Sequence, residues 1–243
     1  RDKGSCSSVP KWATLMSRAI IAIAAVIGFI MLAWSFLQPG DYQWTLPENI
    51  PAPPVPTDNT MSDIKVELGR WLFHDRRLSV NSSMSCATCH RQELAFTDAQ
   101  PVPTGATGER HPRGAMTLVN SGYGSRLTWA NHLLDRLENQ ALTPLFGENP
   151  VEMGMGGREE VVVKLLRTDV RYRSLVPSVF PTDEDPYSVL NAVRAIASFV
   201  RSIVSFDSAY DRYLAGDPSA MDESAVRGMT LFFSEKTECF HCH

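Results

Sequence analysis

Apolar residues recur along this chain mostly at helical spacing, and little of the sequence alternates with the period of two that is typical of β-strands. Beyond residue 60 such a stripe is formed by Ile64, Leu68, Trp71 and Leu72. Thr60 or Ser62 is expected to cap this helix, because a hydroxyl can accept a hydrogen bond from a free backbone N–H. The same spacing predicts further helices within residues 133–141, 159–166, 187–204 and 223–233. The chain is therefore predicted to be mainly α.

A nearly unbroken apolar run covers residues 19–37. At helical rise these 19 residues span about 30 Å, the thickness of a bilayer core. Basic residues precede the run, which predicts a transmembrane anchor with residues 1–18 in the cytoplasm. A cleaved signal sequence is the alternative, although its apolar part is usually shorter and ends in small residues, unlike residues 34–37. Both interpretations predict that the remainder of the chain is exported.

Proline and glycine mark the segments in which no helix is expected. Residues 47–56 contain five prolines, so residues 38–59 are predicted to be an extended, proline-rich linker between the membrane segment and the domain. Residues 101–124 are rich in proline, glycine and threonine and are predicted to form a long ordered loop. Loops of this length usually carry function.

One five-residue pattern occurs twice, as Cys86-Ala87-Thr88-Cys89-His90 and as Cys239-Phe240-His241-Cys242-His243. Cys-x-x-Cys-His is the attachment signal for c-type haem, in which two thiolates form thioethers with the porphyrin and the histidine binds iron. Cysteines three residues apart share one face of a helical turn, so both sulfur atoms can reach the same porphyrin edge. The sequence thus predicts two covalently bound haem c groups.

A zinc knuckle and a thioredoxin-like redox pair are the other interpretations of a Cys-x-x-Cys pair, and the histidine after each pair disfavours both. Four of the five cysteines belong to the motifs, which leaves no partner for a structural disulfide with the fifth. We expect one haem in each of two tandem cytochrome c-like domains, residues 60–207 and 208–243. Because the chain starts with Arg1 and stops at the predicted ligand His243, we expect a fragment whose second domain is truncated.

The amino-acid composition limits the class of protein but does not indicate a reaction. The chain has 243 residues, 44% of them apolar, and a formal net charge of −4, which is ordinary globular material. No basic patch indicates nucleic acid as a partner. Export together with covalent haem attachment predicts a location in the bacterial periplasm, with the chain held at the inner membrane by its N-terminal helix.

Five segments, in order along residues 60–243, carry a resemblance to a known family: residues 68–79 (LGRWLFHDRRLS), 95–98 (AFTD), 137–144 (LENQALTP), 149–153 (NPVEM) and 206–216 (FDSAYDRYLAG). Together they resemble the dihaem cytochrome c peroxidase and MauG family. Residues 127–131 (LTWAN) and 144–148 (PLFGE) are most similar to its MbnH branch, which is associated with copper-peptide biosynthesis and oxidises tryptophan on a partner protein.

The resemblance implies an oxidoreductase that uses hydrogen peroxide at one haem while the other haem stores or relays electrons. It makes His90 the axial ligand of the peroxide-reacting haem and His243 that of the second haem. Glu152 takes the role of the group that moves a proton between the two peroxide oxygens. Its apolar neighbours Val151 and Met153 are expected to raise the pKa of this carboxyl by burial.

Further site residues also follow from the resemblance. Gln140 is expected to hydrogen-bond a bound peroxide or water. Trp129 is expected to relay an oxidising equivalent between the haems. The spacing between Trp129 and Gln140 is one residue longer than is common in the family. His111 lies on the loop from which the peroxidase branch sends a sixth iron ligand, which makes it a candidate for that ligand. Gly114 stands where relatives more often have an asparagine that helps hold calcium, so this sequence lacks that side-chain ligand.

Three functional classes remain open from the sequence. The first is a peroxidase that takes electrons from a small cytochrome or cupredoxin and makes water. The second is a modifying enzyme that oxidises an aromatic residue on a partner protein, and the match at residues 127–131 slightly favours it. The third is a non-catalytic dihaem electron carrier, against which Glu152 and Gln140 argue, because a carrier needs no proton shuttle.

Overall fold

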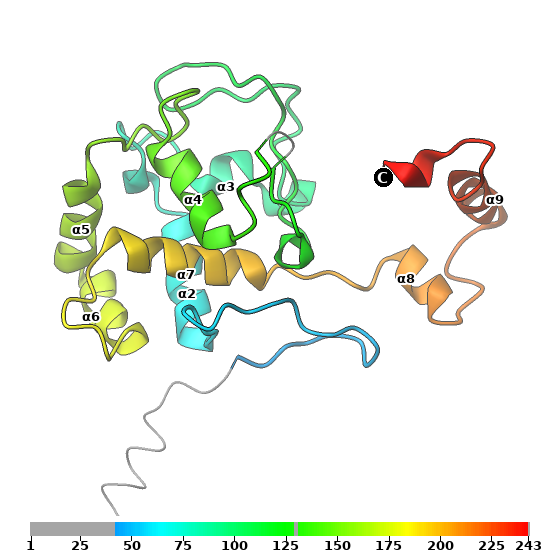
Figure 1. Ribbon diagram of the computed structural model, residues 1–243, viewed down its shortest axis with the longest axis horizontal. Coiled ribbons are helices and arrows are strands. Elements are labelled where there is room, and N and C mark those ends of the chain that lie inside the picture. Colours follow the sequence, from blue (N-terminus) through cyan, green and yellow to red (C-terminus); the bar gives the residue numbers. More distant parts are fainter. Residues whose placement is uncertain (1–41, 129–130, 243) are drawn as a thin grey trace, which may run out of the picture. The chain divides into compact units, whose positions relative to one another are not determined.

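The computed structural model describes residues 42–128 and 131–242 (Figure 1). The apolar run at 19–37 lies outside these residues, as do Trp129 and His243. Within the described part the chain is mainly α and has no β-strand, as the apolar spacing predicted. None of the helices in that part is long and apolar enough to cross a bilayer.

The elements follow one another as short helices joined by loops. The α-helices of the described residues are α2 (Asp63–Phe73), α3 (Cys86–Cys89), α4 (Leu137–Phe146), α5 (Glu159–Thr168), α6 (Val170–Val179), α7 (Val189–Arg201), α8 (Ala209–Leu214) and α9 (Glu223–Phe232). Single turns of 3₁₀ helix are η1 (Arg76–Leu78), η2 (Gln92–Leu94), η3 (Ser121–Tyr123) and η4 (Cys239–His241).

All five predicted helices are confirmed, with shifted ends. The helix predicted within 133–141 begins only at Leu137, because residues 131–136 form turns in which Leu133 is 84% exposed. Helices α6 and α8 were not predicted. Ser62 is the N-cap of α2, and its hydroxyl accepts a hydrogen bond from the backbone N–H of Lys65 at 3.3 Å.

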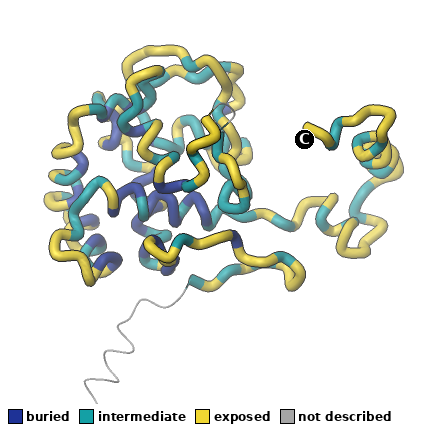
Figure 2. Tube along the Cα trace, viewed as in Figure 1, coloured by how far each residue is buried: buried dark blue, intermediate teal, exposed yellow. Residues whose placement is uncertain are grey.

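The core is built around α7, which packs against α2 and α4. Figure 2 shows the buried residues concentrated on α2 and α7. Leu68 and Leu72 of α2 and Val193 of α7 are fully buried, and each such side chain contributes about 1.5–3 kcal/mol to folding. Gly69 allows the two helices to approach, because a Cβ atom there would lie 1.9 Å from the carbonyl oxygen of Ala195.

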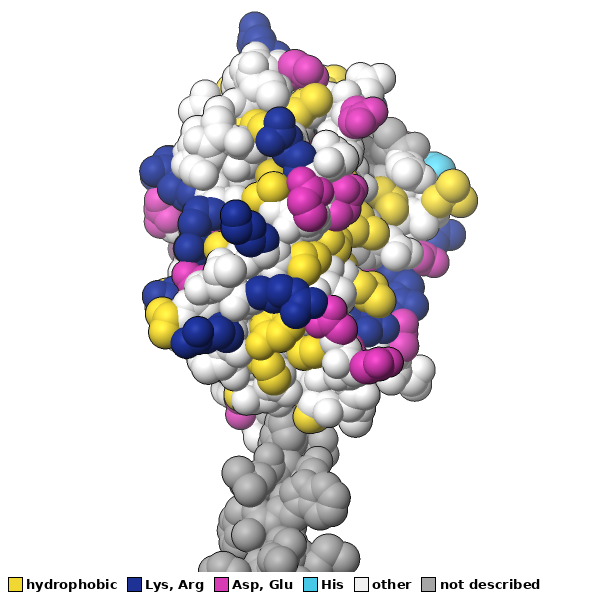
Figure 3. All heavy atoms as spheres, turned by 90° about the vertical axis from the view of Figure 1, so that its left-hand side faces the viewer, with side chains coloured by type: hydrophobic (Ala, Val, Ile, Leu, Met, Phe, Trp, Pro, Cys, Tyr) yellow, Lys and Arg dark blue, Asp and Glu magenta, His cyan; other side chains and the backbone are white. Residues whose placement is uncertain are grey.

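Asp169 joins α5 to α6. Its carboxylate accepts hydrogen bonds from the backbone of Arg171 and Tyr172, which caps α6. The side chain of Tyr172 is fully buried, and its hydroxyl donates to Asp75 Oδ2 at 2.7 Å. Figure 3 shows this side of the domain, where basic, acidic and apolar side chains are interspersed on the surface. The buried tyrosine thus ties α6 to the end of α2.

The proline-rich segment contains no helix, as its composition predicted. It nevertheless contacts the helical domain rather than running free of it. Pro53 and Asn59 are buried, and Tyr123 of η3 donates its hydroxyl to the carbonyl oxygen of Pro51 at 2.8 Å. The amide of Asn59 donates to Glu138 Oε1 at 2.7 Å. The end of the predicted linker therefore helps to build the folded unit.

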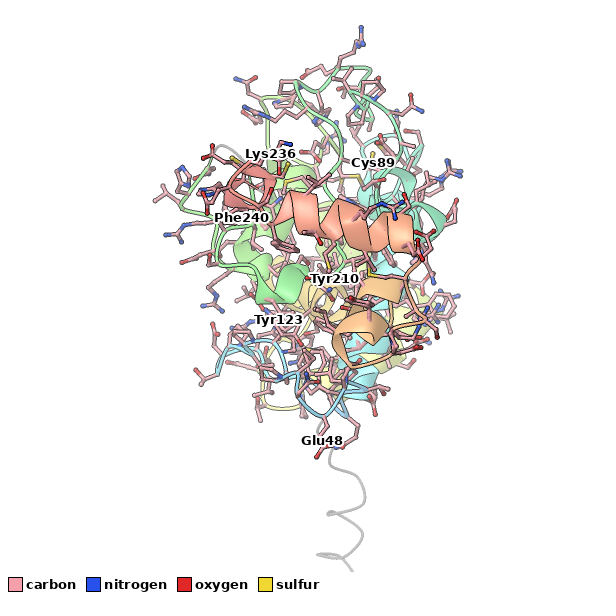
Figure 4. All side chains as sticks on the ribbon, turned by 90° about the vertical axis from the view of Figure 1, so that its right-hand side faces the viewer. Glu48, Cys89, Tyr123, Tyr210, Lys236 and Phe240 are labelled. Atoms are coloured by element: carbon pink, nitrogen blue, oxygen red, sulfur yellow. The ribbon has the colours of Figure 1, made fainter. Side chains whose placement is uncertain are left out.

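Residues 206–242 contain α8, α9 and η4. Ser208 and Asp211 form a capping box at the start of α8, which defines where this helix begins. The ring of Tyr210 stacks on Phe233 with centroids 6.4 Å apart, and Tyr210 and Phe240 are labelled in Figure 4. The division of the chain into two haem domains stays a prediction.

Candidate active site

The first Cys-x-x-Cys-His motif forms a single turn of helix, α3, as its spacing predicted. Ser85 precedes the turn, and its backbone N–H donates to Thr88 Oγ1 at 3.0 Å. The backbone N–H of His90 donates to the carbonyl oxygen of Cys86 at 2.9 Å, which closes the turn. Cys86 and Cys89 are free thiols on one face of this turn. Burial raises the pKa of the Cys86 thiol to about 12 and that of Cys89 to about 11.

The imidazole of His90 is oriented by a backbone carbonyl. Its Nδ1 lies 2.9 Å from the carbonyl oxygen of Phe96, which can only accept, so Nδ1 carries the proton and Nε2 keeps its lone pair. Ala95 and Phe96 both have left-handed backbone conformations, with φ of 53° and 58°, which turn this carbonyl toward the ring. Burial lowers the pKa of His90, which favours the neutral imidazole that iron binds.

A cavity of about 530 Å³ opens beside the motif turn. Its wall contains both thiols and His90, and it also contains three of the polar residues that the resemblance assigned to the site: His111, Gln140 and Glu152. Residues from five separate parts of the chain meet around one space: α3, the 103–118 loop, the 121–134 segment, α4 and the 150–153 turn. Glu152 is the only carboxylate among the lining residues.

The long loop after the motif holds Glu152 in place. The backbone N–H of Ala106 donates to the carbonyl oxygen of Glu152 at 2.7 Å, and Glu109 Oε2 accepts from the backbone N–H of Val151 at 2.9 Å. Gly105 is required at this contact, because a Cβ atom there would lie 2.0 Å from the carbonyl oxygen of Val151. The predicted ordered loop is confirmed, and its contacts fix the backbone that carries Glu152.

The carboxyl group of Glu152 faces a partly apolar environment. Burial raises its pKa, and the positive charge that His111 can carry partly offsets this effect. His111 Nδ1 lies 3.9 Å from Glu152 Oε1, too far for a direct hydrogen bond. The side chain of Glu152 keeps 40% of its surface accessible, so it can meet a small molecule in the cavity.

Gln140 lies on α4 with its amide at the cavity. Its Oε1 is buried and has no hydrogen-bond partner among the described residues. A second, smaller cavity of about 80 Å³ lies between α4 and α7 and is lined by Gln140, His90 and apolar side chains of both helices. An unpaired buried acceptor is costly, so this oxygen is suited to a donor that enters the cavity.

The lining of these cavities fits a covalently attached haem. Two thiols on one helical turn and an imidazole oriented by a backbone carbonyl form the donor set that this group needs. The volume of about 530 Å³ is in the range of sites that bind cofactors. Apolar side chains from α4 and α7 line the smaller cavity. The Oε1 atom of Gln140 lacks a hydrogen-bond donor there, which a bound group can supply.

Other predicted site residues lie elsewhere or outside the described part. Cys239 begins the turn η4 and Cys242 follows it, both as free thiols, while the ligand predicted at His243 lies beyond the described residues. Trp129 lies in the gap at residues 129–130. Gly114 packs against backbone, since a Cβ atom there would lie 3.1 Å from the carbonyl oxygen of Gln100. The described residues contain no cluster of three carboxylate, imidazole or thiol side chains for a metal ion.

Two contributors to the site were missed from the sequence. Phe96 acts through its carbonyl oxygen and Glu109 through a hydrogen bond to a neighbouring backbone, and neither role depends on a recognisable motif. Phe96 did lie in a segment that carried the family resemblance, which was the one available signal.

Comparison with known proteins agrees with the geometry. The chain is 32% identical over 230 residues to the methylamine utilization protein MauG of Methylophilus methylotrophus, a match that covers 94% of this chain and 66% of the relative. It is 38% identical over 196 residues to cytochrome-c peroxidase IdrP1 of Pseudomonas sp. (strain SCT), which covers 80% of this chain and 50% of the relative. The chain thus spans between half and two thirds of the length of these curated relatives.

A solved structure and a family model extend the agreement. The crystal structure of a MauG-like protein associated with microbial copper homeostasis superposes with a TM-score of 0.79 and 46% identity, over 83% of this chain and 58% of that one. The model of the di-haem cytochrome c peroxidase family matches residues 63–219, which include the cavity and its motif turn. These relatives are haem oxidoreductases. The chain belongs to the di-haem cytochrome c peroxidase family.

Proposed function

We propose that this chain forms the peroxide-reacting site of a di-haem oxidoreductase, and that the oxidising power of peroxide is passed to an aromatic residue of a partner protein. The observation that carries the proposal is the shared cavity, in which Glu152 and Gln140 face the same space as the haem-attachment turn and His90. A non-catalytic electron carrier has no use for an acid–base group in such a space.

Each residue of the cavity has a defined task in this proposal. Cys86 and Cys89 hold the first haem through thioethers, and His90 binds its iron through Nε2. When bound, the haem supplies the iron at which peroxide binds and the electrons that break its O–O bond. Cys239, Cys242 and His243 hold the second haem in the same way.

The carboxyl group of Glu152 moves the proton. It takes a proton from the iron-side oxygen of hydrogen peroxide and gives it to the far oxygen, so that the far oxygen leaves as water. Over the complete cycle, peroxide accepts two electrons and two protons and yields two water molecules. The amide of Gln140 donates to the bound peroxide or water through its N–H, and its unpaired Oε1 accepts from the same guest.

Two features support a protein substrate over a small donor. The solved structure of the MauG-like protein is 46% identical to this chain over the matched 58% of its length, and the segment at residues 127–131 is similar to the branch that oxidises tryptophan. In the proposal Trp129 lies on the route by which the oxidising equivalents leave the site.

A cytochrome c peroxidase that takes electrons from a small cytochrome or cupredoxin is the second candidate. It is supported by the 38% identity to a named cytochrome-c peroxidase. For either candidate we place the domain in the periplasm, anchored by residues 19–37 as an uncleaved helix. His111 is proposed as a sixth ligand of the resting iron. Calcium is not part of the proposal.

The proposed role of Glu152 is tested with the variant Glu152→Gln in the haem-loaded protein. We expect the rate at which peroxide changes the haem absorbance to fall by roughly a hundredfold, the usual loss when a general acid–base group is removed. Glu148→Gln is the matched control, since Glu148 is exposed and outside the cavity. An unchanged rate in Glu152→Gln, with haem content intact, overturns the assignment.

The two candidate functions are separated by what becomes oxidised. After addition of peroxide, a modifying enzyme leaves a partner protein with a new oxidised aromatic residue, detected by mass spectrometry. A peroxidase instead oxidises reduced cytochrome c or cupredoxin at a steady rate and leaves the partner protein unmodified.

A further inference from the structure

Two arginines that have no acidic partner among the described residues line the main cavity. Arg113 and Arg126 both line the cavity and both are exposed, and neither forms an ion pair within the described residues. Other exposed arginines outside the cavity wall do have carboxylate partners, as Arg77 has in Asp75 and Asp169. Two guanidinium groups without a carboxylate partner on the wall of one cavity favour an anion there.

A buried hydroxyl faces the same cavity without a partner. Ser121 Oγ lines the cavity, is shielded from solvent and makes no hydrogen bond within the described part of the chain. A hydroxyl in this state costs free energy unless a guest of the cavity bonds to it. Ser121 and the arginines together are called the cationic rim below.

The turn that carries Ser121 is firmly held. The side chain of Asn120 donates to the carbonyl oxygen of Ser205 at 2.9 Å and accepts from the N–H of the same residue at 2.8 Å. Tyr123, labelled in Figure 4, donates to Pro51 at 2.8 Å. These contacts make the unpaired hydroxyl a fixed feature of the cavity wall rather than the product of a mobile loop.

We propose that the cationic rim binds the carboxylates of the haem held at the first motif, with Ser121 and Arg126 as the main contacts and Arg113 as a further cation. The inference rests on the proposed haem site. Haem c is attached through its vinyl groups, and its two carboxylates lie at another edge of the porphyrin. Cys86 and Cys89 supply the thiols for the vinyl side, and the rim supplies cations and a hydroxyl for the acidic side.

Guanidinium groups beside the haem carboxylates also change the reduction potential of the haem iron. A positive charge near the porphyrin disfavours the more positive, oxidised iron, so the rim raises the reduction potential of this haem. Loss of one unit charge at roughly 10 Å in a medium of effective dielectric constant about 20 changes the redox equilibrium about tenfold. For a one-electron couple this corresponds to a fall of about 59 mV.

The test uses the full chain with its haems attached, and haem content is verified by mass. Arg126→Gln is expected to lower one midpoint potential by about 59 mV, while Arg126→Lys restores most of it. Ser121→Ala is expected to shift the carboxylate deformation bands of the haem in resonance Raman spectra. Arg76→Gln is the matched control, because Arg76 is exposed, lies outside the cavity wall and forms no ion pair in the described residues.

The outcomes separate this inference from the proposed function. If Arg126→Gln and Ser121→Ala leave both the potentials and the carboxylate bands as they are in Arg76→Gln, the cationic rim does not bind the haem carboxylates. A rim that instead binds an anionic substrate predicts changed affinity for that substrate with unchanged bands, which also overturns the inference. Peroxide kinetics of Glu152→Gln are measured separately and do not enter these readouts.

Discussion

Replacing Glu138 by glutamine removes the negative charge from an ion pair that is almost completely buried. The side chains of Glu138 and Arg201 are 5% and 3% exposed, and Arg201 Nη2 lies 2.9 Å from Glu138 Oε1. The same oxygen accepts from the amide of Asn59 at 2.7 Å. The pair joins the first turn of α4 to the end of α7. On α4, Glu138 precedes the site residue Gln140 by two positions.

The expected loss of stability follows from this burial. Breaking a buried pair by removing one partner costs about 3–5 kcal/mol, because the remaining charge is left uncompensated. Glutamine keeps a neutral acceptor for Asn59 and Arg201, and such a hydrogen bond returns about 1 kcal/mol. We therefore expect Glu138→Gln to lower the free energy of unfolding by about 2–4 kcal/mol.

Urea denaturation of the haem-loaded chain, followed by far-ultraviolet circular dichroism, measures this loss. The control is Glu67→Gln, which breaks an exposed pair with Arg70 whose side chains are 44% and 46% accessible. That variant is expected to lose less than about 1 kcal/mol. A loss in Glu138→Gln that is no larger than in the control refutes the reasoning.

The effect also has a predicted dependence on pH. Burial alone would raise the pKa of Glu138, but the hydrogen bond from Asn59 and the charge of Arg201 lower it below its ordinary value. A carboxyl with a depressed folded-state pKa stabilises the fold above its unfolded value of about 4.3 and loses that contribution as the pH falls through the folded value. The stability difference between Glu138→Gln and the parent chain should therefore shrink toward pH 3.

Three further predictions concern the site and its support. His90→Ala should abolish the peroxide-sensitive haem signal and spare the other haem in absorbance spectra, so loss of both signals would contradict the assigned division of labour. Gly105→Ala, whose Cβ would lie 2.0 Å from a carbonyl oxygen, should slow the peroxide reaction more than Gly228→Ala on α9, where nothing lies within 4 Å; equal rates in the two variants would be inconsistent with a loop that positions the proton carrier. Tyr172→Phe removes a buried hydrogen bond to Asp75 and should lower the free energy of unfolding by about 1–2 kcal/mol in urea titrations, whereas no loss would show that the bond adds nothing.

Several local features were predictable because they depend on residues close together in the chain. The turn at Cys86–Cys89, the Ser62 cap and the apolar stripes of α5, α7 and α9 follow from spacing and side-chain type. Helix α6 was missed because Asp169 both ends α5 and begins α6, so no loop composition marked the boundary. The start of α4 was placed too early because an exposed apolar residue, Leu133, extended the apparent periodicity.

The candidate site was only partly predictable. Spacing alone predicted the haem-attachment residues, whereas Glu152 and Gln140 were predicted through the family resemblance and not from their own surroundings. A lone glutamate in a sequence is more often a solvated surface residue. The contacts of Gly105 and Glu109 with the segment that carries Glu152 join parts of the chain about 40 residues apart, and no periodic pattern records such contacts.

The amino-acid order was sufficient to predict covalent haem attachment and most helices, because thiol spacing and apolar periodicity act over a few residues. The tertiary structure decided which polar atoms meet: the carbonyl of Phe96 with His90, the buried pair of Glu138 with Arg201, and the unpaired oxygen of Gln140 with the cavity. These contacts between polar atoms depend on how α2, α4 and α7 pack their apolar faces against one another. The free energy gained by burying these apolar faces depends on several segments that are distant in the chain. No single stretch of sequence therefore specifies the packing.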